Sequence, residues 1–152
     1  MKIYLCGPCD SGHRTTMIGV ANTLRENGFT VYCPWEMKIE NAWDMPQEEW
    51  AERVFNNDII AIDNCDVLLM ISYGRISSAG SNFELGYAYG IGKPSCTIQI
   101  TNSDTSLMTY CGSDYYCDIG DRSLNDNLKW IIKHLKNDTL FDYQKECNTT
   151  LT

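Results

Sequence analysis

Two carboxylates interrupt segments that are otherwise apolar. Glu84 lies within the run FELGYA, and Asp58 lies within the run NNDII. Carboxylates are seldom buried among apolar side chains unless they are paired or functional. Two of them acting together can cleave a glycosidic bond with retention, one as nucleophile and the other handling the proton. The alternative for each residue is plain exposure to solvent.

A loop of small residues precedes Glu84 and could hold an anion. Residues 77–81 have the sequence SSAGS and come just before an expected helix. At Ser78, Gly80 and Ser81 the small side chains let backbone N–H groups approach a phosphate or a sugar, and the helix dipole adds about half a positive charge there. Turns between strand and helix are also often rich in Gly and Ser for steric reasons, so both interpretations stay open.

We expect most of the eight cysteines to be free thiols, and their spacing does not match a set of metal ligands. The string CGPC at residues 6–9 matches the dithiol of thioredoxin-like proteins, but it closes the first expected strand instead of following a strand–helix–strand unit. Most cysteines lie in strand-like apolar contexts, so we expect them to be reduced. Cys111 and Cys117 have no second cysteine pair or paired histidines at zinc-finger spacing. The sequence therefore predicts no metal and no cofactor.

The elements that must position these groups alternate between strand and helix. Strands are expected over residues 2–6, 29–33, 66–72 and 94–100, and helices over 14–27, 46–64, 81–91 and 124–135. The third and fourth strands are nearly all apolar, as in strands covered by helices on both faces. The pattern predicts an α/β fold with a doubly wound, flavodoxin-like open parallel sheet. After the fourth strand we expect only a loop, the last helix and a polar tail over residues 136–152.

In such a sheet, ligands bind outside the carboxyl ends of the strands, where the strand order reverses. The loops over residues 7–14 and 73–84 should therefore face each other, with Gly7 and Arg14 on the first. The segment 34–44 is long for a structural connector, and we expect its Trp35 and Trp43 to stack on a bound ring.

Length and charge limit the possible partners. The chain has 152 residues, the size of one domain, which we expect to span 1–152. It carries 12 Lys and Arg against 20 Asp and Glu, a net charge of −8 that repels nucleic acid polymers and acidic membranes. No apolar run approaches the roughly 20 residues needed to span a bilayer, so a cytoplasmic location is expected. The polar tail should fray unless a neighbouring subunit holds it.

Ordered motifs over residues 2–108 resemble the nucleoside 2-deoxyribosyltransferase family. They are KIYLCGP at 2–8, ND at 57–58, CDVL at 65–68, GSNFELGYA at 80–88 and GKP at 92–94. The resemblance implies that Glu84 attacks the anomeric carbon, that Asp58 assists proton transfer or holds the sugar, and that the Tyr4 hydroxyl orients Glu84. A free base or water then resolves the ester. It also implies dimers that assemble further, with a neighbouring subunit completing each site.

Two serines depart from the pattern of transferases that act on free nucleosides. Ser78 stands where these enzymes usually have an Asp, and Ser106 stands where the neighbouring subunit usually supplies an Asn before Leu-Met. Related 2′-deoxynucleoside 5′-monophosphate N-glycosidases have serine at both positions, where the hydroxyls bind the 5′-phosphate. An Asp would repel a phosphate, whereas a serine donates a hydrogen bond without charge. Against this, Pro8 replaces a usual polar residue, and Asp10 lies in an apparent insertion.

The sequence thus predicts an enzyme that cleaves the N-glycosidic bond of a 2′-deoxyribonucleoside or its 5′-monophosphate through an ester on Glu84. Hydrolysis of the monophosphate is favoured, with Arg14 a further phosphate ligand or a solvated residue. One alternative is base exchange on free nucleosides, and another is a nucleotide-binding or sensing module without turnover. The expected partners are a nucleoside or nucleotide, a free base and further copies of the chain, with Ser106 completing the neighbour's site.

Overall fold

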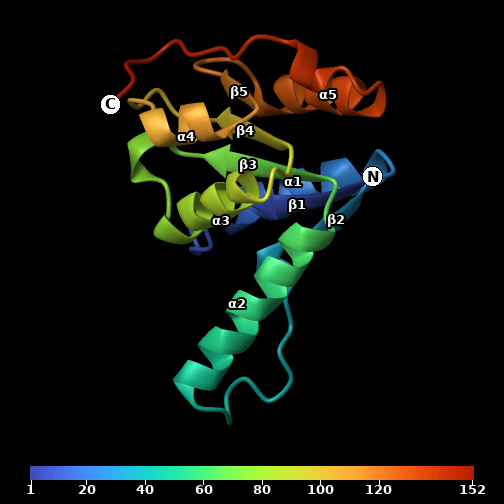
Figure 1. Cartoon of the computed structure of the whole chain (residues 1–152), viewed down its shortest axis with the longest axis vertical. Coiled ribbons are helices and arrows are strands. Elements are labelled where there is room, and N and C mark those ends of the chain that lie inside the picture. Colours follow the sequence, from blue (N-terminus) through green and yellow to red (C-terminus); the bar gives the residue numbers. More distant parts are fainter.

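A computed structural model describes residues 1–152, except for the side chain of Ile76. Five strands form one sheet in the order β2-β1-β3-β4-β5, and every neighbouring pair is parallel. The strands are β1 (Lys2–Cys6), β2 (Thr30–Tyr32), β3 (Val67–Ser72), β4 (Ser95–Gln99) and β5 (Tyr115–Asp118). This confirms the predicted α/β fold and its flavodoxin-like strand order (Figure 1).

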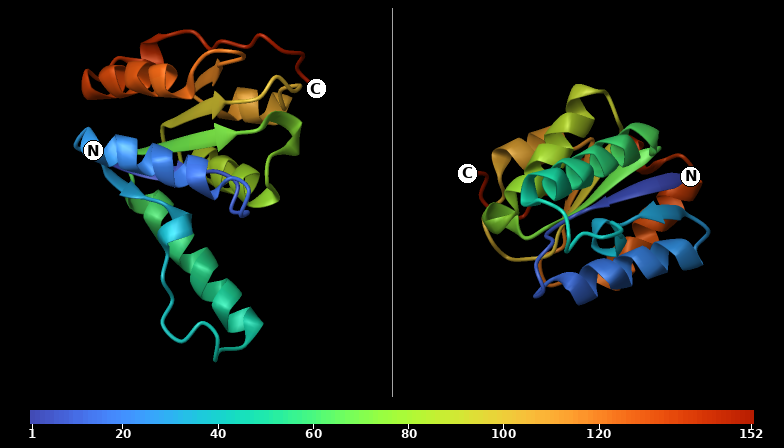
Figure 2. Two further views of the ribbon diagram at one scale, coloured as in Figure 1. Left: turned by 180° about the vertical axis from the view of Figure 1, so that it is seen from behind. Right: turned by 90° about the horizontal axis from the view of Figure 1, so that it is seen from below.

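Helices cover both faces of the sheet (Figure 2). They are α1 (Arg14–Glu26), α2 (Gln47–Asn64), α3 (Ala79–Gly90), α4 (Leu107–Gly112) and α5 (Leu124–Lys136). Side chains of β1 alternate between two cores, because successive residues of a strand point to opposite faces. Ile3 and Leu5 pack in the core with α1 and α5. Tyr4 and Cys6 pack in the core with α2 and α3, which turns both toward the carboxylate-bearing helices.

The prediction of a plain loop between β4 and the last helix was wrong. The structure has α4 and β5 there, and all four residues of β5 are buried. The segment YYCD is short and ends in a charged residue, so it lacks the apolar run that marks a buried strand. Its burial depends on polar partners, because the Tyr116 hydroxyl donates to Gln99 Oε1 at 2.7 Å.

The polar tail is held by the chain itself. Glu146 N donates to Tyr116 O, and Glu146 O accepts from Asp118 N. Further along, Thr105 N donates to Thr150 O, and Thr152 N donates to Thr105 O. The tail therefore runs along the β5 edge and the start of α4 without needing a neighbouring subunit to order it.

α2 stands away from the sheet over its first half (Figure 1). Of its apolar side chains, Ile62 is fully buried, whereas Phe55 remains 51% exposed. Its C-terminal end is anchored, because Lys93 Nζ donates to the backbone carbonyls of Asp63 and Cys65. Among the described residues, none of the helices combines the length and the hydropathy needed to cross a bilayer.

Candidate active site

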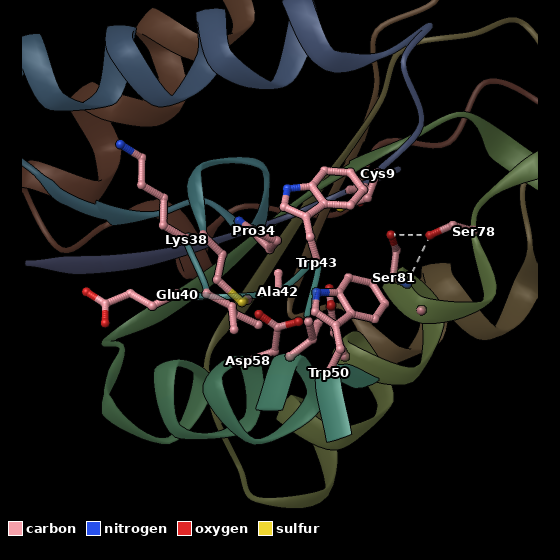
Figure 3. A pocket seen from close by; sticks show the side chains of 16 residues that line it. Cys9, Pro34, Lys38, Glu40, Ala42, Trp43, Trp50, Asp58, Ser78 and Ser81 are labelled. Carbon is pink, nitrogen blue, oxygen red and sulfur yellow. Dashed lines mark hydrogen bonds between the residues drawn. The ribbon is translucent and has the colours of Figure 1, made fainter. Parts of the chain in front are cut away.

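Three elements bring Tyr4, Asp58 and Glu84 to one place near the carboxyl end of β1. Tyr4 comes from β1, Asp58 from the middle of α2 and Glu84 from the second turn of α3. Asp58 and Glu84 line the same cavity of about 810 Å³, together with side chains of the loop before α2 such as Trp43 (Figure 3). Separate elements far apart in the sequence thus deliver two carboxylates to one pocket.

Burial makes the ionised form of both carboxylates costly. Burial raises the pKa of Glu84 to about 7, and the negative charge of Asp58 adds to this rise, while the Cys6 thiol and the Tyr4 hydroxyl oppose it. Burial also raises the pKa of Asp58, while the hydrogen bond from Tyr32 and the nearby Tyr4 hydroxyl oppose this rise. Both carboxyl groups therefore hold their protons to higher pH than ordinary surface carboxylates do, as in sites where carboxyl groups take part in chemistry.

The Tyr4 side chain is fully buried beside both carboxylates. Among the side chains that the structure describes, its hydroxyl has no hydrogen-bond partner of good geometry. Burial and the two negative charges raise the pKa of the Tyr4 hydroxyl, so it stays protonated and able to donate. A buried donor without a partner is costly, and this one lies next to the Glu84 and Asp58 oxygens.

The N-terminus of α3 forms one wall of the pocket. Ser78 is the N-cap: its Oγ accepts from Ser81 N at 3.1 Å and lies 2.6 Å from Ser81 Oγ (Figure 3). At Gly80 an added Cβ would meet nothing within 4 Å, so the backbone there is open to a ligand. N–H groups in the first turn of a helix have no intrahelical acceptor, and they favour anions. α3 begins two residues earlier than predicted, because Ser78 caps it.

Gly7 also lines the pocket, directly after the end of β1. A Cβ at this position would come within 2.4 Å of Met17 Cε, so glycine lets the chain pass close to α1. The expected meeting of the two loops also occurs, since the rings of His13 and Tyr73 contact each other edge-on with centroids 4.0 Å apart.

Arg14 and Trp35 do not line the pocket. The Trp35 indole N–H donates to Pro8 O at 3.0 Å, and its ring packs against the core below α1. The Arg14 guanidinium lies 5.5 Å from the centre of the Trp35 ring. The aromatic side chains that face the cavity are Trp43, which is fully exposed, and Trp50 of α2. In this structure Trp35 thus fixes the loop that follows β1, and Trp43 and Trp50 occupy the places open to a ring.

Ser106 lies outside the pocket of its own chain. It caps α4, accepting from Thr109 N at 3.4 Å, and it lines a separate cavity of about 470 Å³ between α3 and α4. Exposed apolar side chains surround this cavity, with Met108 at 74% and Tyr89 at 68% exposure. Ser106 therefore does not line the cavity that Asp58 and Glu84 share.

Sequence reasoning missed several residues of the site, among them Trp50 and Tyr32. Trp50 precedes Asp58 by eight residues with Val54 between them, and this spacing of four places all three on one face of α2, a signal that was available. Tyr32 gave no such signal, because its contact with Asp58 joins residues 26 positions apart.

The cysteines match the expectation of thiols. All eight are free, and Cys6, Cys33, Cys65, Cys96 and Cys117 are buried. Within the described residues, His, Cys, Asp and Glu side chains form no group of three that could hold a metal ion.

Comparison with known protein families identifies the family of this chain. The sequence matches the nucleoside 2-deoxyribosyltransferase family over residues 3–129. The chain belongs to this family. It is therefore an enzyme of the class that transfers or hydrolyses N-glycosidic bonds, as the motifs predicted. A comparison with curated proteins gave no match.

Solved structures agree with this assignment. The 2-deoxyribosyltransferase of Bacillus psychrosaccharolyticus is 26% identical, with a TM-score of 0.67 over 84% of this chain and 90% of that one. A conserved protein of Enterococcus faecalis V583 is 18% identical, with a TM-score of 0.63 over 89% and 98%. A CMP N-glycosidase of Clostridium botulinum is 17% identical, with a TM-score of 0.61 over 88% and 99%. The last two share the fold.

Proposed function

We propose that this enzyme cleaves the N-glycosidic bond of a 2′-deoxyribonucleoside or, preferentially, its 5′-monophosphate through a covalent ester on Glu84. The observation that carries the proposal is the convergence of Glu84 and Asp58 at one pocket of about 810 Å³, with the unpartnered Tyr4 hydroxyl buried beside them. Raised pKa values on two adjacent carboxyl groups are typical of acid–base sites.

The first half of the reaction forms the ester. An ionised Glu84 oxygen attacks C1′ of the sugar, the bond from C1′ to the base nitrogen breaks, and its electron pair leaves with the base. Asp58 supplies a proton to the departing base or holds the sugar, and Tyr4 donates a hydrogen bond to Glu84 and orients it. In the second half, water or another base attacks C1′ and gives a proton back to Asp58, the ester bond breaks, and Glu84 is restored as a carboxylate.

Ser78, Gly80 and Ser81 would hold the 5′-phosphate. They lie on the pocket wall at the start of α3, where hydroxyl and backbone donors meet the positive end of the helix dipole. A serine at position 78 leaves the wall free of the negative charge that an Asp would add beside a phosphate. Lys38 supplies a positive charge at the same pocket.

The base would lie against Trp43 and Trp50, since aromatic faces stack on purines and pyrimidines alike. Gly7 would face the sugar side of the substrate. Trp35 and Arg14 would support binding indirectly, by fixing the loop that carries Gly7 and Pro8.

A second copy of the chain would complete the site. A groove between α2 and α3 extends the pocket, and Asp58 and Glu84 line both. Apolar side chains flank it, including Phe55 and Phe83, which are more than half exposed and contact each other with ring centroids 5.8 Å apart. Exposed apolar patches of this kind mark protein contacts. A homodimer or higher oligomer would cover the groove and bring Ser106 to the neighbouring site.

Chromatography of incubations with each 2′-deoxynucleoside and each 5′-monophosphate, with and without a second free base, tests the proposal. We expect base release from the monophosphates, lost in Glu84→Ala while the fold is retained. A new nucleoside formed only with the second base would establish base exchange instead, the activity named for the Bacillus psychrosaccharolyticus relative. Tight nucleotide binding without turnover, altered only in affinity by Glu84→Gln, would make the chain a binding module.

A further inference from the structure

Tyr32 of β2 contacts the site from beneath Asp58. Its hydroxyl donates to Asp58 Oδ1 at 3.0 Å. Tyr32 lies opposite Tyr4 in the register of β1 and β2, and the two rings stack with centroids 5.4 Å apart and planes 15° from parallel. Paired positions on neighbouring strands point to the same face of a sheet. The sheet itself therefore fixes the Tyr32 hydroxyl, which a loop would do less firmly.

Asp58 needs such a partner because of where it lies. α2 is anchored near its C-terminal end, where Lys93 and Tyr87 bind Asp63 and its neighbours, and its first half stands off the sheet. A carboxyl group at mid-helix can turn about its side-chain torsions unless one oxygen is held. The bond to Oδ1 restrains that rotation in a residue that also lines the pocket.

We propose that Tyr32 is a positioning residue of the site, whose hydroxyl holds Asp58 Oδ1 so that the other carboxyl oxygen faces the substrate. The inference rests on the proposed function, in which Asp58 handles the proton or the sugar. It adds a residue that no sequence motif marks, and it gives the Tyr4–Tyr32 stack a role in which one ring serves Glu84 and the other serves Asp58.

Other groups also face Asp58, and they set the background for any pH effect. They are Tyr4 from β1, Cys9 from the loop after β1 and Glu84 from α3, while Lys38 and Glu40 from the loop before α2 line the same pocket. Tyr32 differs from the pocket-lining groups in making a direct hydrogen bond to an Asp58 oxygen. That bond favours the ionised carboxylate and lowers the pKa of Asp58.

Tyr32→Phe removes the hydroxyl and keeps the stacked ring. We expect kcat to fall about tenfold, the size of one lost hydrogen bond to a charged group, with KM little changed. The limb of the pH–rate profile that reports Asp58 should move to higher pH. Tyr87→Phe is the matched control, because the Tyr87 hydroxyl also donates to an α2 carboxylate, Asp63 Oδ1 at 2.8 Å, outside the pocket. That variant should keep the wild-type kcat.

A second pair of measurements separates positioning from general damage. In an Asp58→Ala background, Tyr32→Phe should lower kcat no further, because there is no carboxylate left to hold. Carboxyl ¹³C NMR in Glu84→Gln protein should show a higher Asp58 pKa when Tyr32→Phe is added. An unchanged kcat in Tyr32→Phe, or a further loss on top of Asp58→Ala, would overturn the role of Tyr32 alone. A wild-type enzyme that releases no base would overturn the proposed function instead.

Discussion

Two tyrosines buried on the same face of the sheet have opposite surroundings. Tyr116 of β5 lies in a satisfied network, donating to Gln99 Oε1 at 2.7 Å with Thr105 Oγ1 at 3.0 Å. Tyr4 of β1 is equally buried, yet its hydroxyl has no such partner among the described side chains and lies beside two carboxylates. A fully paired buried network stabilises a fold, whereas an unpaired donor retains bonding capacity for a reacting group. Tyr116 thus belongs to a hydrogen-bonded group that stabilises the fold, whereas Tyr4 belongs to the candidate active site.

The largest expected effect concerns Glu84, which lies beside Tyr4. Its ionisation should lower the free energy of unfolding. Its folded pKa of about 7 lies above the ordinary value of 4.5, so the folded state holds the proton more tightly than the unfolded state. The free energy of unfolding then falls as pH rises from about 4.5 through 7. At 1.36 kcal/mol per pH unit, the penalty reaches up to about 3 kcal/mol above pH 8.

Glu84→Gln removes that ionisation. We expect the variant to be more stable than wild type by up to about 3 kcal/mol at pH 8 and equal to it near pH 4, where both side chains are neutral. Urea unfolding at the two pH values measures the difference. Equal stability at pH 8 would place Glu84 in a wetter environment than the pocket described. Tyr116→Phe should show no such pH dependence, which makes it a control from the other region.

The tyrosines themselves give the next effect. Tyr4→Phe should lower kcat about tenfold and leave the free energy of unfolding unchanged or slightly higher, because no good hydrogen bond is lost. Tyr116→Phe should lower the free energy of unfolding by about 1 to 2 kcal/mol and spare kcat, because Gln99 loses a donor. Denaturant unfolding gives the free energy of unfolding of each variant, and initial rates give its kcat. Should the two variants lose stability equally, the contrast between the regions would collapse.

The smallest effect concerns the base. Trp43 is fully exposed and contributes little to the core, so Trp43→Ala should leave stability unchanged and raise KM severalfold through lost stacking, about 1 kcal/mol. Trp35→Ala is the informative companion, since Trp35 packs on the core and holds Pro8 O. It should lower stability as well as affinity. A KM that responds to neither substitution would move base recognition to Trp50.

The sequence allowed much of this to be predicted, for identifiable reasons. Four strands showed as apolar runs, and Glu84 and Asp58 showed as carboxylates out of place within apolar segments. β5 escaped because its burial depends on Gln99 and on a tail that returns to pair with Tyr116 and Asp118. Such long-range partners leave no local periodicity.

The candidate site divides in the same way. Gly7, Ser78, Gly80 and Ser81 line the pocket, and their positions at strand and helix ends had made them candidates; their role in binding stays a prediction. Trp35 was expected over the ring, but a loop that is long in sequence does not reveal which of its aromatic residues turns inward. Tyr32 became visible only through the register of β1 and β2.

α2 is anchored at its C-terminal end, and its N-terminal half stands away from the sheet (Figure 1). The anchoring hydrogen bonds are those from Lys93 to the carbonyls of Asp63 and Cys65. At about 1.5 Å per residue, Asp58 lies about 8 Å along the helix from this anchor, and Trp50 lies about 20 Å from it. When a helix that is anchored at one end bends, residues far from the anchor move more than residues near it. Small flexing of α2 would shift the indole against the base while barely moving the carboxylate. Tolerance for bases of different size would then arise from the compliance of one helix, at little cost to the alignment of the chemistry.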